Sequence, residues 1–86
     1  MTNLSGVYRA TITDTLDPLG LGRVQLNIPA VLGGESSAWA TVLVSYGAPL
    51  TERSRMPENG DNVYVAFENG DAALPIVLGR VVEPVS

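Results

Sequence analysis

Apolar and polar side chains alternate along most of this chain with a period of two, which is the pattern of β-strands whose two faces have different surroundings. Five segments show this pattern or a short apolar run, and each is bounded by glycine, proline, asparagine or aspartate. They cover residues 6–14, 22–28, 37–44, 62–68 and 75–82. Because no segment repeats its apolar residues at helical spacing, we expect an all-β chain with no substantial helix.

The alternation predicts which side chains face the interior. In the second segment Val24, Leu26 and Ile28 alternate with polar residues, and Pro29 should end the pairing because it has no N–H to donate. The inward side chains expected from the first and fourth segments are Tyr8, Ala10, Ile12, Val63, Val65 and Phe67. These three segments are therefore typical of half-buried strands.

The third and fifth segments are apolar on both faces, which a single barrel interior does not explain. The residues that we assign to the core or to an interface are Trp39, Val42, Val44, Val63, Val65, Phe67, Ile76 and Leu78. We expect Trp39 to be buried, because it lies at the start of the densest apolar strand. Outward apolar side chains on these two strands need cover from loops or from another chain.

Turn-forming residues separate the predicted strands, and residues 45–61 form one long connection. The residues expected to define turns or other structural motifs are Asp17, Pro18, Gly20, Gly22, Arg23, Pro57, Gly60, Asp61, Gly70, Asp71, Pro75 and Gly79, of which Pro75 and Gly79 lie in the fifth segment. Asp17 and Arg23 flank the first turn and are placed to pair across it. Five strands with one long connection between the third and fourth predict a single domain over residues 1–86 with a five-stranded, OB-like Greek-key barrel. An SH3-like barrel has nearly the same strand count.

Composition restricts the chemistry of the chain. Its 86 residues include no cysteine and no histidine, the commonest sources of zinc-binding thiolates and of general bases. We therefore expect no catalytic residue, no metal site and no cofactor. The net charge is −4 and all five basic residues are arginines, a balance that disfavours nucleic acid. No apolar run approaches the roughly 20 residues of a membrane span, and the first residues do not resemble a signal peptide, so synthesis in the cytoplasm is expected.

Four motifs have a functional reading beside a structural one. The segment Gly20-Leu21-Gly22 suggests a phosphate loop, but it lacks the third glycine and the helix of a dinucleotide fingerprint, which favours a turn. The acidic residues Glu58, Asp61, Glu68 and Asp71 suggest calcium or a glycosidase, but each pair flanks a turn glycine and the chain is short for a sugar cleft. Turn capping is the favoured role for all four.

The aromatic residues Tyr8, Trp39, Tyr46, Tyr64 and Phe67 suggest a base-stacking platform, because OB folds often bind single strands in this way. Packing in a core or an interface is the favoured role, since a stacking platform normally adds a positive groove. Arg53 and Arg55 form a local basic cluster, for which a solvated loop and contact with a partner are the two interpretations.

A series of motifs then resembles one known family. In chain order they are Gly6-Val7-Tyr8, Asp17-Pro18, Gly20-Leu21-Gly22-Arg23-Val24-Gln25-Leu26, Pro29, Trp39-Ala40, Pro57-Glu58-Asn59-Gly60-Asp61, Val63, Val65, Phe67, Gly70-Asp71, Pro75 and Gly79. The series is similar to the OB domain of phage baseplate spikes, which contractile tail spikes share with the VgrG spikes of type VI secretion systems. The resemblance covers about residues 6–82.

The resemblance implies a structural role and no enzymatic activity. It implies a homotrimeric OB barrel in the baseplate of a virion or phage-like particle made in a bacterium. It also implies two partners, a baseplate hub protein and a spike, needle or tip protein. The sequence contains no needle and no lysozyme domain, so we do not expect membrane piercing by this chain alone. A single-stranded nucleic-acid-binding OB domain is the alternative function.

Overall fold

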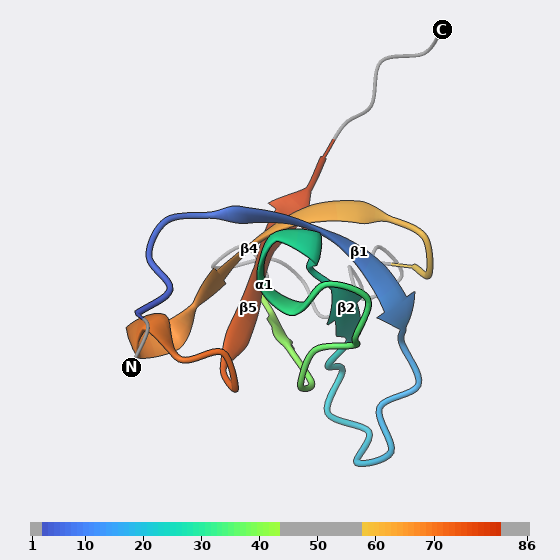
Figure 1. The fold of residues 1–86 in the computed structure, drawn as a ribbon. Helices are drawn as coiled ribbons and strands as arrows, with labels where there is room; N and C mark the ends of the chain where they lie inside the picture. The colour runs from blue at the N-terminus through green and yellow to red at the C-terminus, as the bar shows by residue number, and fades with distance from the viewer. Residues whose placement is uncertain (1–2, 44–57, 82–86) are drawn as a thin grey trace, which may run out of the picture.

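The computed structural model describes residues 3–43 and 58–81, in which the five predicted segments all form strands (Figure 1). In chain order the elements are β1 (Tyr8–Asp14), β2 (Gln25–Asn27), the one-turn helix α1 (Pro29–Leu32), β3 (Thr41–Val42), β4 (Asn62–Phe67), the 3-10 turn η2 (Glu68–Gly70) and β5 (Pro75–Arg80). Every strand lies inside a predicted segment, and β2 and β3 are much shorter than predicted.

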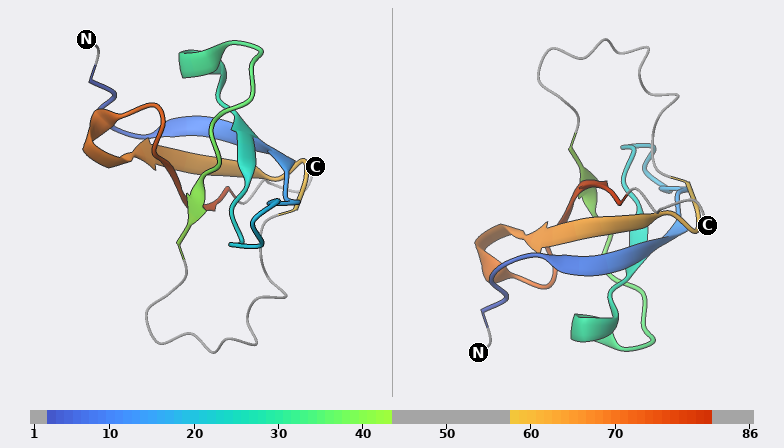
Figure 2. Two further views of the ribbon diagram at one scale, coloured as in Figure 1. Left: turned by 90° about the horizontal axis from the view of Figure 1, so that it is seen from below. Right: turned by 90° about the horizontal axis from the view of Figure 1, so that it is seen from above.

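The strands form one sheet in the order β2-β1-β4-β5-β3, which curls into a barrel (Figure 2). Strand β3 runs parallel to β5, and the other neighbours are antiparallel. The two edges of the sheet meet at two antiparallel bridges, Asn27 with Ser36 and Val24 with Ala40. At the second bridge, Val24 and Ala40 exchange N–H to carbonyl hydrogen bonds of 3.1 and 2.6 Å. The predicted all-β, OB-like architecture with almost no helix is confirmed.

The barrel interior is filled by the side chains that the alternation predicts for β1, β2 and β4, together with Ala40 and Val77. The buried apolar residues are Ala10, Ile12, Val24, Leu26, Ile28, Ala40, Val63, Val65, Phe67 and Val77. Tyr8 is partly buried and packs edge-on against Phe67, with ring centroids 5.6 Å apart. Burial of apolar surface on this scale is the main favourable term in the folding of a small domain.

Helix α1 was not predicted; at this position only the end of strand pairing at Pro29 was predicted. Pro29 ends strand β2 as expected, and its fixed φ also suits the first position of a helix. The Leu32 N–H donates to the Ile28 carbonyl at 2.8 Å, and Gly33, with φ of +62°, ends the turn. Val31 and Leu32 then pack against the buried core. A single turn is too short to show a helical period in the sequence.

The third predicted strand is wrong in its first half, because Ser37 interrupts the pairing with β2. Its hydroxyl accepts a hydrogen bond from the Leu26 N–H at 3.0 Å, where a regular ladder would use a carbonyl. The same hydroxyl donates to the Ala38 carbonyl at 2.6 Å. The two bridges of this pair join Asn27 to Ser36 and Val24 to Ala40. The second partner is three residues from the first on one side and four residues on the other, so the segment with Ser37 contains one extra residue, which is a β-bulge. Regular strand geometry therefore begins only at Thr41.

The expectation that Trp39 is buried is also wrong for the single chain. Ala40 points into the barrel, so the preceding side chain lies on the outer side, and Trp39 is half-buried there. Its ring is covered by the Arg23 guanidinium, whose central carbon lies 5.9 Å from the ring centroid. Val44, Tyr46, Arg53, Arg55 and Pro57 lie outside the described residues.

Candidate functional site

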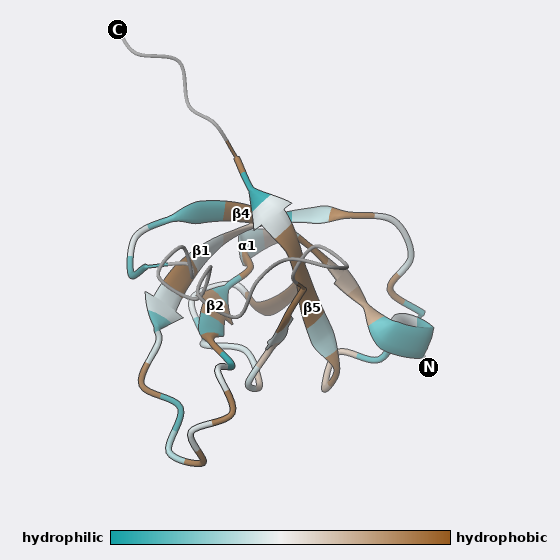
Figure 3. Ribbon diagram, turned by 180° about the vertical axis from the view of Figure 1, so that it is seen from behind, coloured by the Kyte–Doolittle hydropathy of each residue, from teal (hydrophilic) through white to brown (hydrophobic). Residues whose placement is uncertain are grey.

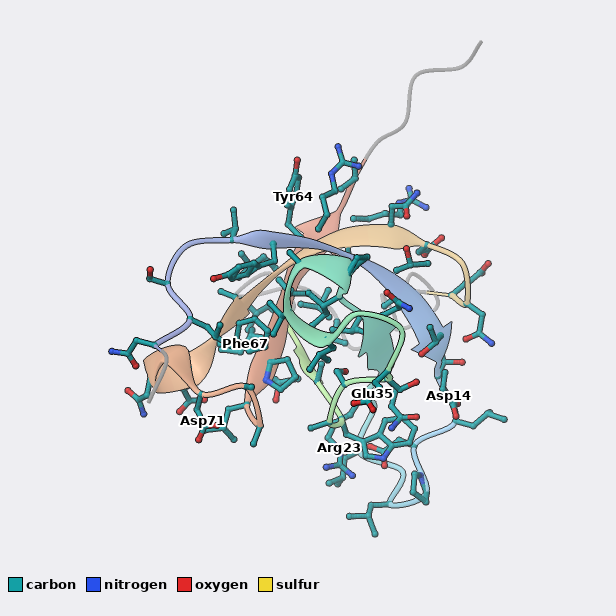
Figure 4. All side chains as sticks on the ribbon, viewed as in Figure 1. Asp14, Arg23, Glu35, Tyr64, Phe67 and Asp71 are labelled. Carbon is teal, nitrogen blue, oxygen red and sulfur yellow. The ribbon has the colours of Figure 1, made fainter. Side chains whose placement is uncertain are left out.

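An apolar surface covers the outer side of strands β3, β4 and β5. We call it the outer face and define it by Leu43, Tyr64 and Leu78, which are between 39% and 53% exposed, together with the half-buried Ala66 and Ile76. Figure 4 shows Tyr64 pointing away from the barrel and Phe67, on the same strand, pointing into it. The outer face therefore consists of the side chains that strand alternation directs away from the barrel interior.

Strand register brings these side chains together. In the antiparallel pair β4 and β5, Ala66 lies opposite Ile76, and Ile76 in turn lies opposite Thr41 in the parallel pair β5 and β3. The Leu43 N–H donates to the Val77 carbonyl at 3.3 Å, which holds Leu43 beside β5. Since side chains alternate, the neighbours of the buried Val77 face outward.

The charge of the outer face differs from that of the chain as a whole. Strands β3, β4 and β5 contain no aspartate or glutamate, although the chain carries a net charge of −4. The Arg9 guanidinium lies over the Tyr64 ring, 5.2 Å from its centroid, and adds positive charge at one side. This face is thus suited to contact with an apolar surface of an acidic protein.

A second apolar feature is the connection between β1 and β2, residues 15–23, which we call the leucine loop. It projects beyond the end of the barrel (Figure 1), and Leu16, Leu19 and Leu21 are between 66% and 83% exposed. Single exposed leucines are ordinary on protein surfaces, but three within six residues of one loop are a local concentration of apolar surface.

Asp17 holds the leucine loop in one conformation. Its carboxylate accepts hydrogen bonds from the backbone N–H groups of Leu19 at 2.9 Å and of Leu21 and Arg23 at 3.2 Å each. The Arg23 side chain binds both carboxylate oxygens, through Nε at 2.8 Å and Nη2 at 2.9 Å. The predicted pairing of these two residues across the turn is confirmed.

This network leaves the Asp17 side chain only 2% exposed. The hydrogen-bonded Arg23 guanidinium, helped by the backbone N–H donors, holds the pKa of Asp17 well below its usual range. Asp17 raises the pKa of Arg23 in return. The pair is therefore fully ionised at neutral pH, and its two charges cancel inside the loop.

Two of the four acidic residues near the other turns, Asp61 and Asp71, bind the backbone as the turn-capping interpretation predicts. Asp61 accepts a hydrogen bond from the Glu58 N–H at 2.9 Å, and Asp71 accepts one from the Ala73 N–H at 2.9 Å. The two turns lie at opposite ends of the six-residue strand β4, about 20 Å apart at 3.3 Å per residue. Within residues 3–43 and 58–81, no three potential ligand side chains cluster to hold a metal.

The turn glycines have a clear structural role at Gly60 and Gly70. Gly60 has φ of +91°, and its N–H donates to the Ile12 carbonyl at 2.8 Å, which closes the end of the β1–β4 pair. Gly70 has φ of +70°, and a Cβ there would lie 2.7 Å from the Asn3 Oδ1 atom. Both positions favour glycine because an L side chain would be strained.

The aromatic residues of the described segments do not form a stacking platform. Phe67 is buried, Tyr8 packs against it, and Trp39 is covered on one side by Arg23. Among the aromatic side chains of residues 3–43 and 58–81, Tyr64 alone is exposed, to 39%. Successive bases need several free rings in a row, and this surface offers one.

The comparison with known protein families decides what kind of barrel this is. Residues 8–81 match the family model of the type VI secretion system/phage-baseplate injector OB domain. The chain belongs to this family. The match begins at the first residue of β1 and ends one residue after β5, so it covers all five strands. A search of curated proteins found no match to the chain.

In this injector OB domain the predicted site residues fall into two groups. Val63, Val65 and Phe67 are in the core and Val42 packs against it, whereas the half-buried Trp39 lies outside the core and Leu78 and Ile76 contribute to the outer face. The leucine loop was missed as a surface feature, although its signal was visible: Leu16, Leu19 and Leu21 stand in a turn sequence where polar residues are usual. No helix within the described ranges is long and apolar enough to cross a membrane.

Proposed function

We propose that this injector OB domain is a homotrimeric collar in a contractile phage tail or a phage-like injection machine, where it joins the central hub to the spike. The role is structural, with no catalytic step and no cofactor. The observation that carries the proposal is the apolar outer face on a member of the injector family. The chain acts in the assembled phage tail or phage-like particle.

The outer face supports self-assembly for a physical reason. A small barrel buries one side of each strand, and here the other side of β3, β4 and β5 is apolar as well. Exposed apolar patches on small soluble proteins mark interaction sites, and closed cyclic symmetry is the common way for identical chains to cover them. Three-fold symmetry comes from the resemblance to baseplate spike domains.

The mass of the particle in solution tests the proposal directly. Size exclusion coupled to light scattering should give three times the chain mass of 9.0 kDa for the chain alone, or three copies of the chain in its complex with the hub protein. Leu78→Lys should reduce that mass, because it places a charge in the outer face. Leu74→Lys is the matched control, since Leu74 is 43% exposed against 42% for Leu78 but lies outside the outer face.

Imaging of the assembled tail tip provides the second test. We expect three copies around the tail axis, between the hub and the spike. A stable dimer in solution, or a single copy away from the axis of the particle, contradicts the proposal.

A further inference from the structure

The outer face and the leucine loop are two separate apolar surfaces of different shape. The outer face lies along the side of the barrel, and the leucine loop projects from one end (Figure 3). In Figure 4, Arg23 of the loop and Tyr64 of the outer face lie on opposite sides of the molecule. One chain therefore presents a broad apolar surface and an apolar projection that point in different directions.

The leucine loop is ordered before it meets any partner. Asp17 binds three backbone N–H groups of the loop, and Arg23 closes the network with two further hydrogen bonds. Binding by a loop that is already held in place loses less conformational entropy than binding by a flexible one. The three exposed leucines are thus arranged as a rigid contact element.

Electrostatics permit a second copy of this chain as the partner. Two chains with a net charge of −4 repel each other, and the repulsion is weakest where the surfaces in contact are free of carboxylates. The strands of the outer face contain none, and within the loop the Asp17 charge is cancelled by Arg23. The charged group that lies over Tyr64 in this face is the Arg9 guanidinium and not a carboxylate.

The same charges disfavour a membrane as the partner. Loops that enter anionic membranes are flanked by lysine or arginine, which attract the lipid headgroups. This chain contains no lysine, and Arg23, the arginine of the loop, is already bound to Asp17. A protein surface without carboxylates is the better match.

We propose that the leucine loop of one copy packs against the outer face of the next copy, in a head-to-tail contact. One repeated interface then covers both apolar surfaces, and such a contact closes into a ring when the rotation between copies is suitable, 120° for a trimer. This inference rests on the proposed self-assembly and adds which surfaces meet.

A head-to-tail contact makes a specific prediction for mixed variants. The loop variant carries Leu19→Ser and Leu21→Ser, and the face variant carries Leu43→Ser and Leu78→Ser. By light scattering at equal chain concentration, each variant alone should be monomeric. An equimolar mixture should form a complex of two chains, because the intact loop of the face variant still fits the intact outer face of the loop variant. Leu74→Ser, the control, should keep the mass of the parent.

Cysteine pairs supply a test that does not depend on disrupting the interface, since the chain has no native cysteine. A variant with Leu19→Cys and Leu78→Cys should form covalent multimers under mild oxidation at low protein concentration. The control with Leu19→Cys and Leu74→Cys should form far fewer. Folding of every variant is checked by circular dichroism.

The outcomes separate this inference from the proposed function. If the parent is oligomeric but the loop variant keeps the parent mass, the head-to-tail contact is wrong and the collar proposal stands. A mixture of loop and face variants that stays monomeric also overturns the contact. If the parent remains monomeric with and without its hub protein, self-assembly itself is wrong, and both proposals fail.

Discussion

The barrel interior and the leucine loop use the same residue type in opposite ways. Leu26 is 0% exposed in the interior, whereas Leu16 in the loop is 83% exposed. The interior is held by apolar packing between strands, while the loop is held by one carboxylate that binds backbone N–H groups and a guanidinium. Order in a small domain thus has two sources, and they should respond to different perturbations.

The largest expected effect is a difference in stability between variants at Leu26, in the interior, and at Leu16, in the loop. Leu26→Ala removes buried methyl groups and leaves a cavity in the core, which should lower the free energy of unfolding by about 2 to 5 kcal/mol. That loss is a large part of the stability of a small domain. Leu16→Ala, at the exposed position, should leave stability nearly unchanged. Urea unfolding followed by circular dichroism measures both, and equal losses would contradict the comparison.

The second prediction concerns the buried polar residue of the interior, Ser37. Ser37→Ala removes the hydroxyl that accepts the Leu26 N–H and leaves that donor unsatisfied, which should cost about 1 to 3 kcal/mol. The neighbouring Ser36→Ala is the control, because Ser36 is exposed. If both variants unfold at the same urea concentration, the bulge does not depend on the Ser37 hydroxyl.

The third prediction tests the polar source of order in the leucine loop. Asp17→Asn weakens the contact with Arg23, so the amide hydrogens of Leu19, Leu21 and Arg23 should exchange faster with solvent, while those of β4 keep their protection. Hydrogen exchange followed by NMR measures each amide. Uniform loss of protection across the barrel would show that the loop and the core are one cooperative unit.

The pH dependence of the same variant gives the fourth prediction. Because the pKa of Asp17 is lower in the folded chain than its unfolded value of about 3.9, its contribution to stability is complete above that value and is lost as the pH falls below it. The difference in melting temperature between the parent and Asp17→Asn should therefore be present at pH 7 and shrink toward pH 2. A difference that does not change in acid contradicts the ionic network.

The smallest expected effect is the absence of nucleic-acid binding. Both exposed apolar surfaces lack a row of cations, and the chain is acidic, so a labelled single-stranded oligonucleotide should show no change in fluorescence anisotropy at physiological salt. Binding below micromolar concentration that weakens with salt would instead support the nucleic-acid alternative.

Much of the barrel was predictable because strand faces are encoded locally. The alternation of Val24, Leu26 and Ile28 with polar residues already places these three side chains inside, and the structure confirms it. The pairing of Asp17 with Arg23 was also accessible, since the two residues flank one short turn. The position of Trp39 was not, because the bulge at Ser37 depends on contact with a strand ten residues away.

The sequence by itself determined the places of the five strands, the inward faces of β1, β2 and β4 and the family of the chain, because these follow from residue spacing along short segments. Tertiary structure alone decided that the β2 edge pairs with the segment before β3 through the bridges Asn27–Ser36 and Val24–Ala40, and that the leucines of the β1–β2 loop stay exposed. The physical reason is that an apolar residue carries the same preference for burial everywhere. Whether that residue is buried depends on which distant segment packs against it. In the leucine loop, the carboxylate of Asp17 holds the backbone in a position where none of the described segments covers the leucines.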